Sequence, residues 1–367
     1  MIFDDKNLKS DEKAIFALRS IYGKYGYSRY KMNKFEEYDL YVRNKDFLIS
    51  DNVITFTDTN GKLMALKPDV TLSIIKNCTD EKGIVQKMYY DENVYRVSKG
   101  RVGFREITQV GLECIGDIDD YNVSEVLVLA AESLMTISDE WVLDISHLGI
   151  LSDAVEKLDV DRETQREIIK CVGEKNPHEL RRLCGEGAGE LLIKLVTTYG
   201  DAREVIEKLK GLDVSEQYIN ELEGVVSAFE MCGLAKKLRI DFSVVSDIKY
   251  YNGISFKGFI NGVPEAVLSG GRYDNLMKRM GKKSGAIGFA VYIDLLEEIE
   301  KESSKYDIDT LLLYEEGEEQ KNIFHATARL SERGHSVVAQ RAKPEKLRYK
   351  KLMKLKDGEV TCLEDNA

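Results

Sequence analysis

The sequence lacks the residue patterns that mark several broad classes of protein. Its six cysteines form no C-x-x-C pair and its four histidines are equally dispersed, so no metal site can be recognised. Scattered cysteines of this kind are typical of a reduced cytosolic protein. No apolar run of about 18 residues could span a membrane, and the opening MIFDDKNLKSDEK is too polar for a signal peptide. We therefore expect a cytoplasmic protein that uses no metal or other cofactor.

An excess of positive charge is also missing. The formal net charge is −11, and the 32% of residues that are charged carry both signs interspersed. Proteins that grip a nucleic-acid backbone need clustered lysine and arginine, so nucleic acid is not an expected partner. The lysine-rich residues 343–356 are the best candidate for a local basic patch, but we interpret them as the solvated face of a helix.

The rest of the composition is that of an ordinary globular protein. With 367 residues, 43% of them apolar, the chain can form a large core and, at roughly 100–200 residues each, two or three domains. Apolar residues at helical spacing predict a helix from Ser10 to Gly26, and an Asn60-Gly61 turn predicts a hairpin. Strands are predicted at residues 53–57, 63–66, 83–90 and 106–115, with a helix that begins at Thr71.

The middle of the chain has a different texture. Between residues 151 and 234 proline is nearly absent and apolar residues recur at helical spacing, which predicts an all-helical insertion. Strands are predicted again at residues 240–245, 254–260, 266–268 and 287–291, with a helix from about Tyr273. We therefore expect a core of residues 1–300 that holds the insertion at about 151–236.

A separate unit is predicted at the C-terminal end. It follows a polar linker at residues 301–305 and covers residues 306–367. Strands are predicted at residues 310–314, 336–340 and 359–363, with a helix at 318–333. Such alternation predicts a small α/β unit.

One strand combines polar residues on one face with apolar residues on the other. Alternate residues of a strand share a face, so Gln109, Gly111 and Glu113 point the same way. The opposite face carries Val110, Leu112 and Cys114. The polar face suits recognition of a cationic or amide-bearing small molecule, with room above the glycine. A solvated sheet face with alternating polarity is the other interpretation of the same pattern.

Several motifs resemble those of class II aminoacyl-tRNA synthetases in their histidyl form, in the right order over residues 18–297. Residues 89–116, YYDENVYRVSKGRVGFREITQVGLECIG, resemble the second signature motif. SGGRYD at 269–274 and GAIGFAVYIDLL at 285–296 resemble the glycine-rich and third motifs. LRSIYGKYGYSRYKMNKFE at 18–36 is similar to the first motif, which builds a dimer interface, although Asn33 replaces the family's proline. The resemblance implies an α+β fold with an antiparallel sheet flanked by helices, and a homodimer.

The resemblance also implies an amino-acid site. LKPDVT at 66–71 is similar to the segment that holds the amino group of the amino acid, which assigns Asp69 and Thr71 to an α-ammonium. Glu113 matches a residue beside the imidazole of a bound histidine, where a carboxylate accepts from a ring N–H. By the same match the expected histidine-binding set is Asp69, Thr71, Arg96, Gln109, Glu113, Tyr250, Tyr251, Gly270 and Gly271.

The sequence departs from the motifs mainly at positions that serve ATP in the family, which we call the ATP side. The third motif ends in the family on glycine, one residue, an acid and arginine, whereas those positions here are Tyr292, Asp294 and Leu295. The histidyl-specific arginine-glycine is replaced by Ser246 and Asp247, and the adenine-contacting glutamate of the second motif is Ser98. Activation of an amino acid by ATP calls for fixed positive charge, which these residues do not supply. The lost arginine at position 246 also removes a partner for the amino-acid carboxylate.

The sequence keeps the amino-acid site and lacks the ATP arginines. In this combination it resembles the regulatory subunits of ATP phosphoribosyltransferase, the HisZ type. That resemblance implies a non-catalytic subunit in histidine biosynthesis that activates a short catalytic subunit and mediates feedback inhibition by L-histidine. Residues 307–367 resemble a truncated anticodon-binding domain. Two alternatives remain open: an active histidyl-tRNA synthetase with displaced ATP ligands, and a sensor of another amino acid or of uncharged tRNA.

Overall fold

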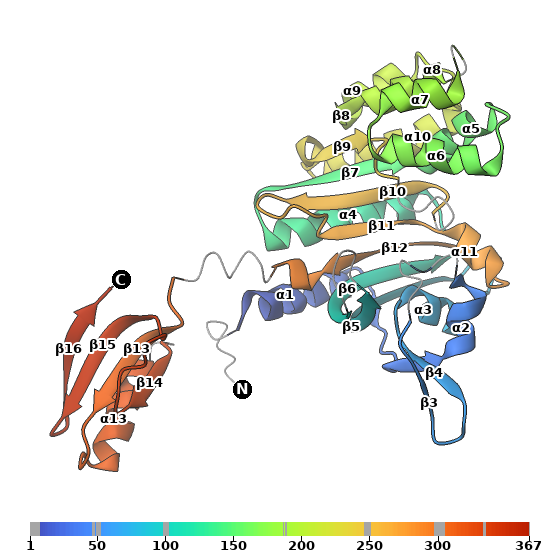
Figure 1. Cartoon of the computed structure of the whole chain (residues 1–367). Coiled ribbons are helices and arrows are strands. Elements are labelled where there is room, and N and C mark those ends of the chain that lie inside the picture. The colour runs from blue at the N-terminus through green and yellow to red at the C-terminus, as the bar shows by residue number, and fades with distance from the viewer. Residues whose placement is uncertain are drawn as a thin grey trace. The chain divides into compact units, whose positions relative to one another are not determined.

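The computed structural model describes residues 8–45, 48, 53–97, 103–185, 187, 189–245, 251–296, 305–332 and 335–366. The chain forms two compact units, one of Ala14–Leu296 and a smaller one that includes Glu297–Ala367. Figure 1 labels the elements of each unit. In the described part of the chain, no helix is both long enough and apolar enough to cross a membrane.

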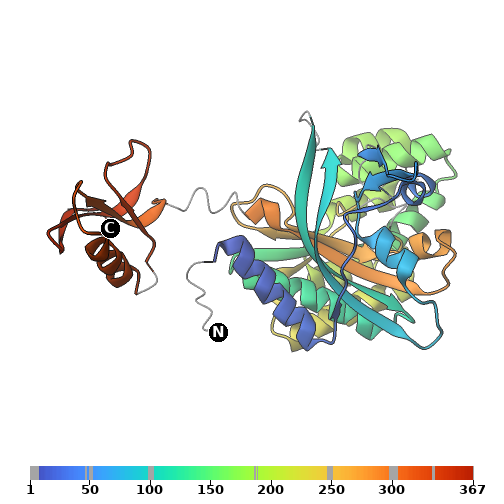
Figure 2. The same ribbon diagram turned by 90° about the horizontal axis from the view of Figure 1, so that it is seen from below.

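A nine-stranded sheet forms the centre of the larger unit. Its neighbours are antiparallel except for the pairs β1·β5 and β7·β9. This confirms the α+β fold with an antiparallel sheet, and Figure 2 shows its two long strands, β5 and β6, side by side. In spatial order the strands are β1 (Ser28–Arg29), β5 (Val85–Val97), β6 (Phe104–Gly116), β12 (Gly285–Tyr292), β11 (Leu268–Arg272), β10 (Ile254–Ile260), β7 (Trp141–His147), β9 (Leu238–Asp241) and β8 (Tyr199–Asp201).

Two helices cover the apolar face of this sheet. They are α1 (Ser10–Lys24), which precedes Gly26 with its positive φ of 81°, and α4 (Asp120–Ile137), which begins with a capping box at Asp119. The hydroxyls of Tyr22 in α1 and Ser133 in α4 lie 3.0 Å apart and join the two helices. The other face of the sheet is therefore left for the polar residues.

The insertion is mainly helical. Its helices are α5 (Leu148–Glu156), α6 (Arg162–Gly173), α7 (Pro177–Cys184), α8 (Glu190–Thr197), α9 (Ala202–Leu209) and α10 (Glu216–Met231), which Figure 1 shows grouped beyond β7 and β9. Side chains of Asp161, Asn176 and Asp201 accept from backbone N–H groups at the starts of α6, α7 and α9. The prediction of an all-helical segment is wrong at one place, because β8 pairs with the edge of β9.

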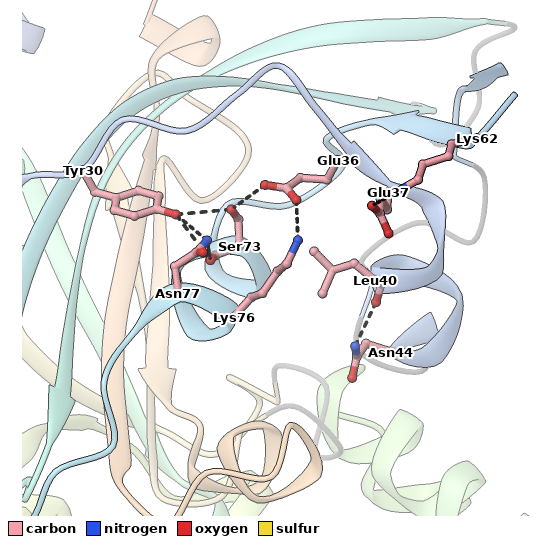
Figure 3. A network of polar contacts seen from close by, with 9 residues as sticks. All are labelled: Tyr30, Glu36, Glu37, Leu40, Asn44, Lys62, Ser73, Lys76 and Asn77. Atoms are coloured by element: carbon pink, nitrogen blue, oxygen red, sulfur yellow. Dashed lines mark hydrogen bonds and ion pairs between the residues drawn. The ribbon is translucent and has the colours of Figure 1, made fainter. Parts of the chain in front are cut away.

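A small block packs on the polar face over β5 and β6. It contains a three-stranded sheet of β2 (Phe35–Glu37), β4 (Leu63–Leu66) and β3 (Thr55–Thr57), with the helices α2 (Tyr38–Arg43) and α3 (Thr71–Asn77). Gly61 has a φ of 81° in the predicted hairpin turn between β3 and β4. Glu36 accepts hydrogen bonds from Ser73 Oγ at 3.2 Å and Lys76 Nζ at 2.8 Å, which tie β2 to α3 (Figure 3).

The remaining elements of the larger unit lie near their predicted places. The strand predicted at residues 254–260 is β10, and that at 287–291 lies within β12. The strands predicted at 240–245 and 266–268 are found as β9 and β11, each displaced by two residues at its start and four at its end. The helix predicted from Tyr273 is α11 (Asp274–Arg279), and β12 leads into the short 3-10 helix η4 (Ile293–Leu295).

In its described residues, 305–332 and 335–366, the smaller unit consists of a four-stranded sheet and one helix. Its order is β14 (Val337–Gln340), β13 (Ile308–Tyr314), β15 (Tyr349–Lys356) and β16 (Glu359–Asp365), and the helix is α13 (Gln320–Ser331). The prediction of a helix face for residues 343–356 is therefore wrong. Leu352 and Leu355 are buried in β15, which pairs with β13 and β16. Three of its four lysines, Lys350, Lys351 and Lys354, form ion pairs, so much of the positive charge of β15 is compensated.

Candidate amino-acid site

The polar face of β6 is buried rather than solvated. Only 3% of Gln109 and 2% of Glu113 are exposed, which contradicts the interpretation as a solvated sheet face. On the opposite face Val110, Leu112 and Cys114 belong to the main hydrophobic core, as predicted. Buried polar groups need partners, so the contacts of Glu113 define the site.

Glu113 accepts two hydrogen bonds from other elements. Thr71 Oγ1, at the first residue of α3, donates to Glu113 Oε1 at 2.7 Å, and the Tyr273 hydroxyl donates to Oε2 at 2.5 Å. Burial raises the pKa of Glu113 to about 8, and the nearby Asp69 adds to the rise, whereas the two donors oppose it. Gly288 lies opposite Glu113 in β12, where a Cβ would lie 1.8 Å from Oε2. The carboxylate therefore occupies the space above a glycine.

Asp69 is a second buried carboxylate beside Glu113. The Leu72 N–H donates to Asp69 Oδ1 at 2.9 Å, and Arg96 Nη2 lies 3.7 Å from Oδ2. Burial raises the pKa of Asp69, and the positive charge of Arg96 and the backbone donors act against the rise. Arg96 Nε donates to the Pro68 carbonyl at 2.6 Å, which holds the guanidinium against this turn.

Tyrosine rings close over the glycines of this face. A Cβ on Gly111 would lie 2.5 Å from the Tyr90 hydroxyl, and a Cβ on Gly271 would lie 2.6 Å from Tyr251 Cδ1. The space predicted above Gly111 is therefore filled by Tyr90. Burial raises the pKa of both phenols, and the charge of Glu113 contributes to each rise, so Tyr90 and Tyr251 both lie close to the carboxylates as neutral groups.

Among the residues that the structure describes, the site carries more negative than positive charge. Asp69 and Glu113 lie near the positive charge of Arg96. The buried Lys67, two residues before Asp69, is paired with Glu92 instead. Burial disfavours ionisation of both acids and raises both pKa values, and at Glu113 the nearby charge of Asp69 adds to the rise. A cationic ligand group would restore the balance and allow both carboxylates to ionise.

Comparison with known proteins places this chain in a family. The family model described as histidyl-tRNA synthetase matches residues 4–296. The ATP phosphoribosyltransferase regulatory subunit of Clostridium kluyveri is 31% identical over 343 residues, which cover 88% of this chain and 86% of the relative. The chain belongs to the histidyl-tRNA synthetase-like family of ATP phosphoribosyltransferase regulatory subunits.

Solved structures agree with this fold. The crystal structure of an ATP phosphoribosyltransferase regulatory subunit/histidyl-tRNA synthetase from Bacillus halodurans C has a TM-score of 0.74 at 21% identity, covering 96% of this chain and 99% of that chain. The ATP phosphoribosyl transferase (HisG:HisZ) complex from Thermotoga maritima matches with a TM-score of 0.61 at 18% identity, covering 77% of this chain and 97% of that chain. At these identities the two structures show the fold.

Within the third motif, the two positions that depart from the synthetase pattern, Tyr292 and Leu295, have structural roles. Leu295 packs against the main core, and Asp294 Oδ1 accepts from the Thr108 N–H at 2.8 Å. The Tyr292 hydroxyl lies 2.7 Å from Ser269 Oγ, so a phenol ring occupies the polar face where the synthetase motif has glycine. These contacts supply packing and hydrogen bonds, and none of them brings a cation to the ATP side.

The structure separates the predicted site residues into groups. Asp69, Thr71, Arg96, Glu113 and Tyr251 come together, and Gln109 lies buried on the same face of β6. Gly270 faces the other way, since its Cβ would lie 2.5 Å from Phe289 Cβ in the core; it does not face the site. Tyr250, with Ser246, Asp247 and Lys249, lies outside the described residues, as does Ser98.

Sequence reasoning missed two tyrosines of the site. Tyr273 belongs to the SGGRYD motif, but its hydrogen bond to Glu113 joins residues 160 positions apart. Tyr90 pairs with Gly111 across β5 and β6. The register of that hairpin, once known, would have placed Tyr90 above the glycine.

Proposed function

We propose that this chain is the non-catalytic regulatory subunit of an ATP phosphoribosyltransferase and that it binds L-histidine as an effector. The family assignment supports the regulatory role, because a relative with that name is 31% identical over most of both chains. The proposed ligand contacts are Asp69, Thr71, Gln109, Glu113 and Tyr251. The ATP-side positions lack the cations that adenylate formation needs, which supports a role without aminoacylation.

The observation that carries the effector proposal is the buried pair of carboxylates. A histidine offers an ammonium with three N–H donors and an imidazole with at least one. In this proposal Asp69 and Thr71 bind the ammonium, and Glu113 accepts from a ring N–H. Ionised carboxylates bind such donors about twice as strongly as neutral acceptors do. Ligand binding therefore replaces the proton that the site holds in its absence.

The mechanism that we propose is allosteric. Without histidine, the complex holds the short catalytic subunit in an active arrangement. Histidine binding favours an inhibited arrangement of the same assembly, with a coupling of about 1–3 kcal/mol, or roughly 5–150-fold. A homodimer formed through the first motif, at residues 18–36, would present two such sites to the catalytic subunits.

The proposal also covers the origin of the smaller unit. We infer that residues 306–367 are a shortened form of an anticodon-binding domain that has lost tRNA binding. Its strand β15 carries lysines that are paired with acids of the same unit, such as Lys354 with Glu315. A surface of paired charges is poorly suited to a phosphate backbone.

The test is a substitution at the carboxylate beside the proposed imidazole. Glu113→Gln should raise the L-histidine concentration that half-inhibits the reconstituted ATP phosphoribosyltransferase by tenfold or more, which corresponds to at least about 1.4 kcal/mol of lost binding. Activation of the catalytic subunit should be unchanged. Glu265→Gln, at an exposed glutamate, is the matched control. Unchanged inhibition in Glu113→Gln would show that histidine acts elsewhere.

A second candidate function follows from the matching family model, which is described as histidyl-tRNA synthetase. An active synthetase would catalyse histidine-dependent exchange of pyrophosphate into ATP. Exchange above background would overturn the proposal of a non-catalytic subunit. Tight, salt-dependent binding of uncharged tRNA would instead favour a tRNA sensor.

A further inference from the structure

The polar face continues beyond the carboxylates to β10. In that strand Phe256 and Gly258 face the core, where a Cβ on Gly258 would lie 2.6 Å from Leu134 Cδ1 of α4. Lys257, between them, therefore lies on the polar face. It pairs in register with Ser269, which pairs with Ala290, which pairs with Gly111. Lys257 thus belongs to the same row across the sheet as the glycine between Gln109 and Glu113.

Lys257 is a half-buried cation without a counter-ion. Its side chain makes no hydrogen bond or ion pair with any residue that the structure describes. Asp144 lies opposite it in β7, but Arg239 takes that carboxylate with two bonds, from Nε at 2.6 Å and Nη2 at 2.9 Å. Burial lowers the pKa of Lys257, which reflects the cost of keeping an unpaired ammonium there.

An unsatisfied hydroxyl lies beside this lysine. Ser146 of β7 pairs with Ser255 of β10, so it is the diagonal neighbour of Lys257 on the same face. Ser146 is fully buried, and its Oγ has no hydrogen-bond partner among the described residues. Buried polar groups without a partner are rare. Two donors, an ammonium and a hydroxyl, are therefore available at one place.

We propose that Lys257, assisted by Ser146, binds the carboxylate of the amino acid whose ammonium and imidazole bind at Asp69 and Glu113. This inference rests on the proposed histidine site and identifies the ligand class as a free α-amino acid. It also supplies a carboxylate partner in place of the histidyl-specific arginine that the sequence lacks. Ammonium–carboxylate hydrogen bonds are among the stronger ones in proteins.

The spacing of the strands allows one ligand to reach both ends. The Glu113 carboxylate lies above Gly288 of β12, and β10 is two strands further, at about 10 Å. An extended amino acid together with the flexible lysine side chain can bridge that distance. In this arrangement the imidazole of the ligand lies toward Glu113 and its carboxylate lies toward Lys257.

The test compares two ligands that differ in the carboxylate. Isothermal titration calorimetry would measure binding of L-histidine and of histamine, which keeps the ammonium and imidazole, to the full chain. Lys257→Met should weaken L-histidine binding about tenfold or more and change histamine binding less than about twofold. Lys257→Arg should restore part of the loss, and Ser146→Ala should weaken L-histidine binding to a smaller extent. Lys236→Met, at an exposed lysine, is the control.

The outcomes separate this inference from the function on which it rests. If the unaltered chain binds L-histidine and Lys257→Met weakens both ligands equally, or neither, the carboxylate role is overturned while the histidine site stands. If the unaltered chain binds no L-histidine, both proposals fall. Thermal melting followed by circular dichroism shows whether each variant is folded. If Lys257→Met does not fold, binding of L-histidine and histamine to Lys257→Arg is compared instead.

Discussion

Glu113 should make the stability of the unliganded protein depend on pH in a way that a single substitution removes. Its pKa is raised to about 8, mainly by burial, from an ordinary value of 4.5. Between these two pH values the folded protein keeps a proton that the unfolded chain has released. Stability contributed by this group is complete below pH 4.5 and is lost as the pH rises toward 8. Glutamine has the same shape and no ionisation.

The magnitude follows from the two pKa values. Each tenfold change in proton activity between them corresponds to 1.36 kcal/mol, so the change at Glu113 between pH 5 and pH 9 is about 4 kcal/mol. The stability of Glu113→Gln relative to the unaltered protein should therefore increase by about that amount from pH 5 to pH 9. In the glutamine variant one of the hydroxyls of Thr71 and Tyr273 donates to the amide oxygen and the other must accept from the amide NH2 group, so a constant cost adds at every pH.

Urea unfolding followed by far-ultraviolet circular dichroism at pH 5, 6, 7, 8 and 9 measures this difference. Glu265→Gln, at an exposed position, should show no such trend. A stability difference for Glu113→Gln that is the same at pH 5 and pH 9 would refute the reasoning, because it would mean that Glu113 ionises in the folded protein as it does in the unfolded chain.

The remaining predictions concern packing around the same site. Tyr41 is fully buried and its hydroxyl has no hydrogen-bond partner among the described residues, so Tyr41→Phe should raise the free energy of unfolding by about 1 kcal/mol. Tyr273→Phe, which removes a donor to Glu113, should lower it by about 1–3 kcal/mol in the same urea titration; equal effects of the two would contradict this account. Gly288→Ala should lower stability by about 1–3 kcal/mol or more, because the new methyl group would overlap the Glu113 carboxylate. Its control is Gly224→Ala in α10, where the methyl group meets nothing within 4 Å and should stabilise the helix; matching losses at both glycines would refute the steric argument.

Much of the fold follows from local patterns in the sequence. Alternation in β6 correctly predicted which residues face the core, and the Asn60-Gly61 turn correctly predicted a hairpin. The same rule applied to Gly270 and Gly271 would have shown that neighbouring residues of a strand point to opposite faces, so that only one of them faces the site. The prediction of a helix at the lysine-rich residues 343–356 was wrong because lysine suits an exposed position of a helix or a strand equally well.

Other features depend on contacts between distant residues. No prediction was made for α4 or β7, although α4 covers the sheet and β7 carries Ser146. The raised pKa of Glu113 depends on burial by elements from distant parts of the chain, including α3 and β12. Lys257 has no partner among the described residues because Asp144, which lies opposite it, is already hydrogen-bonded to Arg239. Only the register of β7, β9 and β10 reveals this arrangement.

The central claim is tested most directly by enzyme activity in a reconstituted complex. ATP phosphoribosyltransferase activity of a short-form catalytic subunit would be measured with and without this chain and then titrated with L-histidine. The account predicts activity that appears only when this chain is present and that falls as L-histidine is added. A cognate catalytic subunit whose activity is the same with and without this chain would contradict it.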